Sequence, residues 1–294
     1  MDDELIAPRA NQSRHTYVAD GRTVGFFTDP TVCIGCKACE VACKEWNDVP
    51  ADGYTFTGRS YDNTGGLGAS TWRHVKFVEM DRQLGAQNTG ASIRSATQQL
   101  APGTNPFGWL FLSDVCKHCE HAGCLEACPT GSIFRTEVGS VYVQDDVCNG
   151  CGYCIVSCPF GVIDRRPAPL PGAGGAFKCT FCYDRQSAGL TPACAKACPT
   201  ESIQFGPLDE LRARADRRVE DLKARGFAEA QIYDPSDTSV GGIHAFALLP
   251  VSPALVGLPA KPEVPTIYLR GAWISAALTS GLAIAGACLA FALL

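Results

Sequence analysis

Cysteine spacing constrains this chain more than any other feature of its sequence. The stretch from residue 148 to 159 reads C-N-G-C-G-Y-C-I-V-S-C-P, and three further groups of four cysteines lie elsewhere in the chain. A run of C-x2-C-x2-C-x3-C-P is typical of thiolate ligands to [4Fe–4S] clusters, so the sequence predicts four clusters. The four motifs use 16 of the 17 cysteines. They are Cys33, Cys36, Cys39 and Cys43; Cys116, Cys119, Cys124 and Cys128; Cys148, Cys151, Cys154 and Cys158; and Cys179, Cys182, Cys194 and Cys198.

Each motif is expected to share its ligands with a partner motif. In bacterial-ferredoxin runs the first three cysteines bind one cluster and the fourth ligates a second cluster. Only 19 residues separate Cys128 from Cys148, a short return that suits a compact two-cluster unit, so we pair the second motif with the third and the first with the fourth. The predicted ligand sets are set 1, Cys33, Cys36, Cys39 and Cys198; set 2, Cys116, Cys119, Cys124 and Cys158; set 3, Cys148, Cys151, Cys154 and Cys128; and set 4, Cys179, Cys182, Cys194 and Cys43.

Other uses of the cysteines compete with this interpretation. Disulfide-rich scaffolds are short secreted domains, whereas this chain has 294 residues. Structural zinc sites normally take two C-x2-C pairs, not the three-plus-one run seen here. His118 and His121 lie inside the second motif and are candidate iron ligands, although four cysteines already suffice there. Cys288 lies in an apolar segment and is predicted to be inert and buried.

The chain divides into four predicted parts. Residues 1–24 form a polar N-terminal extension without the basic and apolar regions of a signal peptide. Residues 25–206 form the four-cluster domain, with an outer module from motifs 33–43 and 179–198 and an inner module from motifs 116–128 and 148–158. Residues 207–265 hold an amphipathic helix, a strand and a proline-rich extended linker, and residues 271–294 form a transmembrane helix.

The predicted fold class is α+β, with tandem ferredoxin-like modules, loop insertions and one terminal helix. An internal repeat supports it, because C-P-T-G-S-I, C-P-F-G-V-I and C-P-T-E-S-I each place an isoleucine five residues after the last cysteine of a motif. We expect the proline to turn the chain and the isoleucine to begin a strand over the cluster. Residues 72–80 predict a further strand, with Trp72, His74 and Lys76 alternating against Arg73, Val75 and Phe77.

Two helices are predicted after the last motif. In residues 207–227, apolar positions recur at helical spacing, and the opposite face carries Arg212, Arg214, Arg217, Arg218 and Lys223. That face is a docking surface or, more simply, a solvated helix face. Residues 271–294 carry no charge and would extend over roughly 36 Å, enough to cross a bilayer core. A buried core helix is the alternative.

Charge patterns add three expectations. A net charge of −5 gives no reason to expect a nucleic-acid partner. Ala277, Gly281 and Ala285 form a small-xxx-small ridge on the terminal helix, which favours close packing against a membrane partner. Cations beside a cluster favour its reduced form. Because four of the five lysines within two residues of a cysteine ligand flank the first and fourth motifs, we expect higher potentials in the outer module. The five are Lys37, Lys44, Lys117, Lys178 and Lys196.

Several runs of residues resemble the β subunit of membrane-bound formate dehydrogenase. They are C-I-G-C-K-A-C-E-V-A-C-K-E-W-N-D at 33–48, C-K-H-C-E-H-A-G-C-L-E-A-C-P at 116–129, K-C-T-F-C-Y-D-R at 178–185 and L-K-A-R-G-F at 222–227, with the terminal apolar helix after them. The cysteine spacing alone indicates only the wider family of four-cluster subunits that serve molybdenum and tungsten oxidoreductases. The K-E-W-N-D run and the terminal helix favour the narrower identification.

The resemblance implies a non-catalytic subunit that conducts electrons through four [4Fe–4S] clusters. Its implied partners are a molybdenum- or tungsten-bis-pterin catalytic subunit that oxidises formate, and a cytochrome b subunit that reduces quinone in the membrane. Arg270 and Lys261 would place the clusters in the cytoplasm by the positive-inside rule, whereas the resemblance implies the outer, periplasmic-side face. The alternatives are the equivalent subunit of a nitrate reductase, sulfur-compound reductase or hydrogenase, and a structural metal-binding protein.

Overall fold

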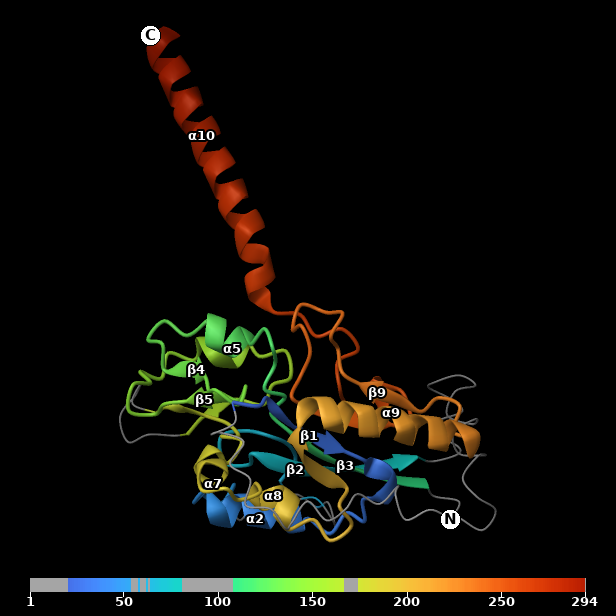
Figure 1. The fold of residues 1–294 in the computed structure, drawn as a ribbon. Helices are drawn as coiled ribbons and strands as arrows, with labels where there is room; N and C mark the ends of the chain where they lie inside the picture. The colour runs from blue at the N-terminus through green and yellow to red at the C-terminus, as the bar shows by residue number, and fades with distance from the viewer. Residues whose placement is uncertain are drawn as a thin grey trace.

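The computed structural model of the chain describes residues 21–53, 58, 62, 64–80, 108–166 and 174–293. The first twenty residues of the predicted extension, the polar stretch at 84–105 and most of the proline- and glycine-rich stretch at 167–176 lie outside the described part. Small sheets and short helices form one folded body, and the long helix α10 (Leu269–Leu293) projects from it (Figure 1). Helices and strands thus mix along the chain, as the α+β prediction requires.

A four-stranded sheet combines a strand from the beginning of the folded body's sequence with three strands from its end. Its order is β8 (Ile203–Pro207), β1 (Val24–Thr28), β10 (Ala245–Leu249) and β9 (Gln231–Tyr233). Strand β1 runs antiparallel to β8 and parallel to β10. Because β1 leads into the first cysteine motif and β8 follows the fourth, their pairing brings these two motifs to the same end of the sheet.

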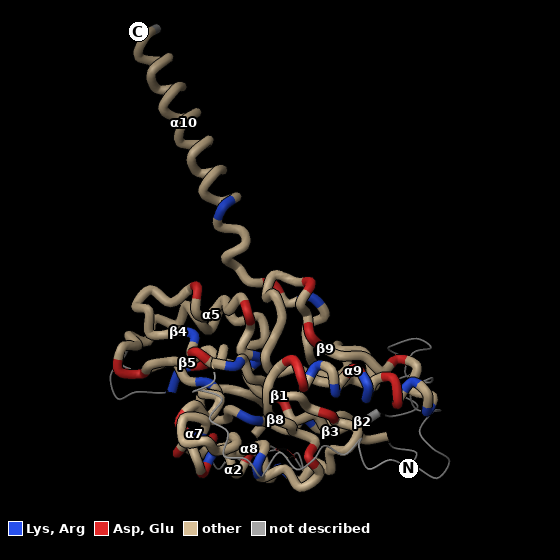
Figure 2. The backbone as a smooth tube through the Cα atoms, in the orientation of Figure 1, with Lys and Arg blue, Asp and Glu red and all other residues tan. Residues whose placement is uncertain are grey.

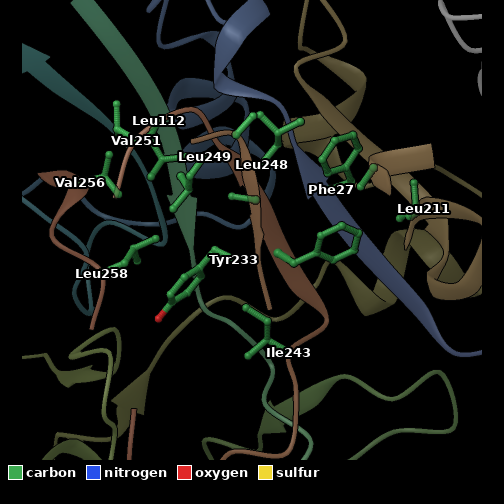
Figure 3. Packing of buried hydrophobic residues seen from close by; sticks show 14 of the residues in the cluster. Phe27, Leu112, Leu211, Tyr233, Ile243, Leu248, Leu249, Val251, Val256 and Leu258 are labelled. Atoms are coloured by element: carbon green, nitrogen blue, oxygen red, sulfur yellow. The ribbon is translucent and has the colours of Figure 1, made fainter. Parts of the chain in front are cut away.

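The largest apolar core lies between this sheet, helix α9 (Leu208–Ala224) and strand β3 (Gly108–Val115). Phe27, Leu211 and Leu248 meet there (Figure 3), and each is at most 2% exposed. Burying side chains of this size stabilises the fold by about 1.5–3 kcal/mol each. Phe26 belongs to a second cluster of buried residues that contains cysteines. Strand β1 therefore separates an apolar core from the cysteine-rich half of the molecule.

The proline-rich segment is folded, contrary to the expected extended linker. It contains the short helices η3 (Pro253–Val256) and η4 (Pro265–Tyr268), and its apolar side chains enter the core (Figure 3). Strand β10 also lies inside the main sheet, so the predicted boundary at residue 206 separates no structural units. The buried valine and leucine side chains of the segment are Val251, Val256, Leu258 and Val264.

The basic face of α9 is largely engaged within the chain itself. Arg218 binds Asp29 at 2.9 Å, Arg212 binds Asp234 at 2.8 Å, and Arg214 donates to the side chain of Gln204 at 2.7 Å. These bonds hold the helix to the loops and strands beneath it. They favour the interpretation as an ordinary surface face over a docking surface.

The cysteine motifs are carried by short helices and hairpins. The antiparallel pairs are β2 (Arg73–Met80) with β3, β4 (Ile133–Arg135) with β5 (Val141–Val143), and β6 (Asp164–Arg165) with β7 (Ala176–Phe177). Ile133 and Ile203 begin strands, as the repeat predicts, and Ile163 directly precedes one. The helices are α2 (Ala38–Trp46), α5 (Gly123–Glu126), α6 (Tyr153–Val156), α7 (Tyr183–Ser187) and α8 (Ala193–Lys196).

Helix α10 is long and apolar enough to cross a membrane. The candidate span covers residues 265–292 at a mean hydropathy of 1.9, and none of it is buried against the rest of the described chain. Figure 2 shows one basic position near the base of the helix and no charge beyond it, and the sequence has Arg270 there. The absence of any packing partner within the described chain argues against the alternative of a buried core helix. Cys288 is exposed on this helix, contrary to the expected burial.

Gly123 marks the tightest approach between the helices of the inner module. A Cβ atom added there would lie 2.6 Å from the carbonyl oxygen of Ser157 and 3.0 Å from Val264. Gly123→Ala is therefore expected to destabilise the inner module by about 1–3 kcal/mol, a typical cost of overpacking. Thermal unfolding of the metal-loaded complex measures the effect. Gly206→Ala is the matched control, because a Cβ added at Gly206 meets nothing within 4 Å; equal losses in the two variants would contradict the expectation.

Candidate metal centres

The first and fourth motifs are fastened together by residues that follow Cys43. The indole Nε1 of Trp46 donates to Asp184 at 2.7 Å, and the guanidinium of Arg185 lies 4.1 Å from the Trp46 ring centre. The amide Nδ2 of Asn47 lies 3.8 Å from the sulfur of Cys43 and 3.9 Å from that of Cys182. Trp46 thus joins α2 to α7 by packing, and Asn47 reaches sulfurs of both motifs.

Within each predicted set, some thiols lie close enough to raise one another's pKa. Burial, and then the neighbouring thiols of Cys179, Cys194 and Cys182, raise the pKa of Cys43 well above its ordinary value. Cys43 is therefore close to the fourth motif, as the crossed assignment of set 4 expects. Iron binds thiolates, so loading this site with iron would release protons.

The other three groups show the same arrangement. In set 2, burial and then Cys116, Cys158 and Cys124 raise the pKa of Cys119. In set 3, burial and then Cys148, Cys151 and Cys128 raise the pKa of Cys154 to about 11. In set 1, burial raises the pKa of Cys33 against a lowering by the backbone N–H of Gly35, and Cys198 and Cys36 add to the rise. Each fourth cysteine thus neighbours thiols of the partner motif.

Some thiols of different sets also lie close enough to raise one another's pKa. Cys194 of set 4 is among the groups that raise the pKa of Cys39 in set 1, although burial is the largest cause. Cys116 of set 2 acts in the same way on Cys179 of set 4. Cys154 of set 3 acts on Cys124 of set 2. These three influences link the predicted sets in the order 1, 4, 2, 3.

In two of the three copies of the repeat, hydroxyl groups lie beside the sulfur of the last cysteine. The hydroxyls of Ser132 and Thr130 lie 3.2 and 3.6 Å from the sulfur of Cys128. Burial raises the pKa of Cys128, but these hydroxyls and the backbone N–H groups of Ile133 and Thr130 outweigh it, and the pKa falls to about 7. Thr200 repeats the contact to Cys198 at 3.9 Å. The T-x-S part of the repeat therefore binds sulfur, a role that sequence reasoning missed.

His118 is not arranged as an iron ligand through its Nδ1 atom. That atom accepts a hydrogen bond from the backbone N–H of Val141 at 3.0 Å. The ring is fully buried, and burial is the main cause that lowers its pKa, so Nε2 carries the proton of the neutral ring. The described residues offer Nε2 no hydrogen-bond partner. An orphaned donor in a cavity that Cys116 and Cys124 also line fits a sulfur-rich group bound there.

The donor set as a whole fits iron–sulfur clusters better than single metal ions. Among the described residues, no three Cys, His, Asp or Glu side chains lie close enough together to hold one metal ion. A cubane carries iron at four corners, so its thiolates need not converge on one point. Backbone N–H groups also point at ligand sulfurs, from Ala176 to Cys148 at 3.4 Å and from Phe181 to Cys179 at 3.3 Å.

The lysines that flank the motifs differ in their surroundings. Lys37 pairs with Glu40 and Asp62, both at 3.4 Å. Lys44 pairs with Asp52 at 2.5 Å, and Lys117 pairs with buried Asp114. Lys178 is 2% exposed, and among the described residues its Nζ atom binds only backbone carbonyl groups. Sequence position near a cysteine therefore does not by itself give an unbalanced cation. Arg73, fully buried beside Cys194, is a further functional candidate that the motif search missed.

Two family models match the chain, and both are described as "4Fe-4S dicluster domain". One matches residues 32–132 and the other residues 107–208. Together they cover the four cysteine motifs. The chain therefore contains tandem [4Fe–4S] dicluster domains, in agreement with the predicted fold class.

Curated relatives match most of the chain. It is 40% identical over 240 residues to the "Formate dehydrogenase iron-sulfur subunit" of Haemophilus influenzae. The aligned region covers 80% of this chain and 68% of that relative. It is 38% identical over 256 residues to the "Formate dehydrogenase-O iron-sulfur subunit" of Escherichia coli, covering 85% and 76%. It is 36% identical over 190 residues to an anaerobic dimethyl sulfoxide reductase subunit of Escherichia coli, covering 65% and 76%.

Proposed function

The protein is a member of the family of formate dehydrogenase iron–sulfur subunits, and we propose from this premise that it holds four [4Fe–4S] clusters and conducts electrons out of a formate-oxidising partner. Members of the family are non-catalytic electron-transfer subunits of an enzyme complex. The proposed electron donor is a molybdenum- or tungsten-bis-pterin catalytic subunit. The proposed acceptor is a membrane cytochrome b subunit that reduces quinone.

The proposed ligands are the four crossed sets. The clusters supply one-electron storage and transfer, and the chain supplies sixteen thiolates, a dry interior and hydrogen bonds to sulfur. Two observations support the crossing: the proximity of Cys43 to the thiols of the fourth motif, and the pairing of β1 with β8. The same pairing of elements supports an outer module from motifs 33–43 and 179–198, and an inner module from motifs 116–128 and 148–158.

The succession of the sets supports one path through the chain. Sets 1 and 4 sit on α2, α7 and α8, which lie on the side of the body away from α10 (Figure 1). The inner module touches the base of α10, where Thr266 donates a hydrogen bond to Glu126 of α5. We propose that the end of the path at set 1 faces the catalytic subunit and that the end at set 3 faces the membrane subunit. The observation that carries the proposed function is the succession of cysteine sets from the side away from α10 to the base of α10.

The proposed location is a single-pass attachment to the cell membrane, with the cluster domain on the outer, periplasmic-side face. Tyr268 and Trp273 are exposed at the start of α10, where aromatic rings settle at a membrane interface. Arg270 and Lys261 are only two cations near the helix, and so few give the positive-inside rule little weight. The family relationship therefore decides the proposed side.

Purification of the native complex tests the function. We expect about 16 irons per chain, a brown protein and reduction of a dye by formate through a co-purifying pterin subunit. A colourless protein that contains zinc would support a structural metal-binding protein and contradict the proposal. So would a complex with full iron content in which formate reduces neither the dye nor quinone.

A second candidate is the equivalent subunit of another membrane oxidoreductase. The observation that favours it is the 36% identity to the dimethyl sulfoxide reductase subunit. The same purified complex separates the two, because this candidate expects oxidation of reduced dye by dimethyl sulfoxide or another sulfur compound, and no response to formate. A nitrate reductase or hydrogenase complex would respond to nitrate or hydrogen instead.

A further inference from the structure

Three cationic side chains are buried among the described residues, and two of them have no carboxylate partner. Arg73, Lys117 and Lys178 are 1%, 4% and 2% exposed. Lys117 pairs with Asp114, which Lys76 also approaches at 2.8 Å. Neither Arg73 nor Lys178 forms an ion pair within the described residues. A buried charge needs a compensating charge, so these two cations require an anion that the side chains around them do not supply.

Arg73 lies between sets 1 and 4. Its Nη2 atom donates to the sulfur of Cys194 at 3.4 Å, and its Nη1 atom donates to the hydroxyl of Ser113 at 3.3 Å. That hydroxyl lies 3.3 Å from the sulfur of Cys39. The guanidinium also rests on the Phe26 ring at 4.8 Å, and its Nε atom has no partner among the described residues. One cation therefore reaches a ligand of set 4 directly and a ligand of set 1 through one hydroxyl.

Lys178 lies between sets 4 and 2. Its Nζ atom donates to the carbonyl oxygens of Val141 and Cys179, the latter at 3.2 Å. It lines the same cavity as Cys116, Cys124 and Cys158 of set 2. Lys178 directly precedes Cys179 of set 4 in the chain, so its buried side chain lies beside ligands of both sets. This is the point at which the outer and inner modules meet.

We propose that Arg73 and Lys178 are the counter-ions of the cluster path and set its potentials. Arg73 raises the reduction potentials at sets 1 and 4, and Lys178 raises those at sets 4 and 2. Reduction adds one electron to a cluster that is already anionic, so a fixed cation nearby stabilises the reduced form more than the oxidised form. The low dielectric of the interior strengthens this effect, and burial prevents screening by salt. The inference rests on the proposed four-cluster ligation.

Removal of each charge tests the inference in the purified complex. The variants are Arg73→Gln and Lys178→Met, and the readouts are iron content followed by a redox titration monitored by EPR. Cys36→Ser, Cys119→Ser, Cys151→Ser and Cys182→Ser assign the signals to sets 1, 2, 3 and 4. At a fixed potential we expect the reduced-to-oxidised ratio to fall at least tenfold at sets 1 and 4 in Arg73→Gln. Tenfold corresponds to 59 mV for a one-electron couple.

The second variant has a different expected pattern. Lys178→Met should lower the ratio at least tenfold at sets 4 and 2 and change set 1 much less. Lys44→Met is the matched control, because Lys44 also adjoins a cysteine ligand but is partly exposed and paired with Asp52. It should change every ratio less than threefold. An equal shift in Lys44→Met, or no shift in either test variant at full iron content, would overturn the proposal.

Charge-conserving variants decide the case in which a test variant loses iron. Arg73→Lys and Lys178→Arg should then keep iron and hold the ratios within threefold of the native complex. If these variants bind a full complement of iron but their reduced-to-oxidised ratios still fall tenfold, charge is not the cause and the proposal fails. Failure of the proposed function is distinguishable, because it appears in the native complex itself as fewer than four clusters.

Discussion

Replacing Cys43 with alanine is expected to remove the cluster of set 4 and to leave that of set 1 intact. Cys43 lies in the same motif as three ligands of set 1, yet the groups that raise its pKa are, after burial, the thiols of Cys179, Cys194 and Cys182. A cubane left with three protein thiolates loses iron or breaks down, so the complex should lose up to about four of about sixteen irons. Iron analysis and EPR of the reduced complex measure the loss.

The same variant should nearly abolish quinone reduction by formate. The sets form one line in the order 1, 4, 2, 3, so a break at set 4 separates the catalytic end from the membrane end. Reduction of a soluble dye directly at the catalytic subunit should persist. Cys288→Ala is the control, because Cys288 lies on α10 outside every motif. If Cys43→Ala and Cys33→Ala lose the same EPR signal, the two cysteines share a cluster and the crossed assignment is wrong.

The repeated cysteine motifs made much of the fold predictable from sequence. The repeat that ends in Ile133, Ile163 and Ile203 correctly anticipated buried side chains at or beside the start of strands, because each copy must turn at the proline and cover a cluster. The apolar periodicity of α9 also appeared in the structure, since Leu208, Leu211, Ala215 and Leu222 are buried. In both cases the signal is local and comes from covalent spacing.

The segment after β10 was harder to predict, because its burial depends on distant partners. Five prolines between residues 250 and 265 indicate an extended chain, and proline does fix the backbone locally. The valines and leucine between them nevertheless pack against Leu112, Leu249 and Tyr233. Composition alone cannot show that a neighbouring core has room for these side chains.

The sequence gives little indication of the charged residues at the centre of the site. In the strand at 72–80 the alternation places Arg73 on the same face as Val75 and Phe77, and an arginine on an apolar face is unusual. Its role depends on Cys194, which lies far along the chain. Lys178 and Lys44 look alike in sequence, since both adjoin a cysteine, and only burial and the position of Asp52 distinguish them.

Truncation after Leu269 is expected to release the complex from stable membrane attachment while sparing its clusters. The cut removes nearly all of α10, which makes no buried contact with the described body of the chain, and keeps η4, whose Thr266 bonds to Glu126. The shortened chain should therefore keep its iron and pass electrons to a soluble dye when bound to the catalytic subunit. Membrane fractionation should show that most of the complex leaves the membrane, and formate-to-quinone assays should show that most of the quinone reduction is lost.

A single substitution within the helix separates anchoring from partner packing. Ala277, Gly281 and Ala285 leave a shallow ridge on which another helix can approach closely, and Gly281→Leu would block that approach without shortening the apolar span. We expect Gly281→Leu to remain in the membrane fraction but to lose cytochrome b subunit during purification, and quinone reduction with it. Ala272→Leu, which lies outside the ridge, should behave as the native chain does. A truncated complex that stays on the membrane and reduces quinone at the full rate would show that the attachment lies elsewhere, in the partner subunits, because nothing else in the described chain is apolar over a bilayer's thickness.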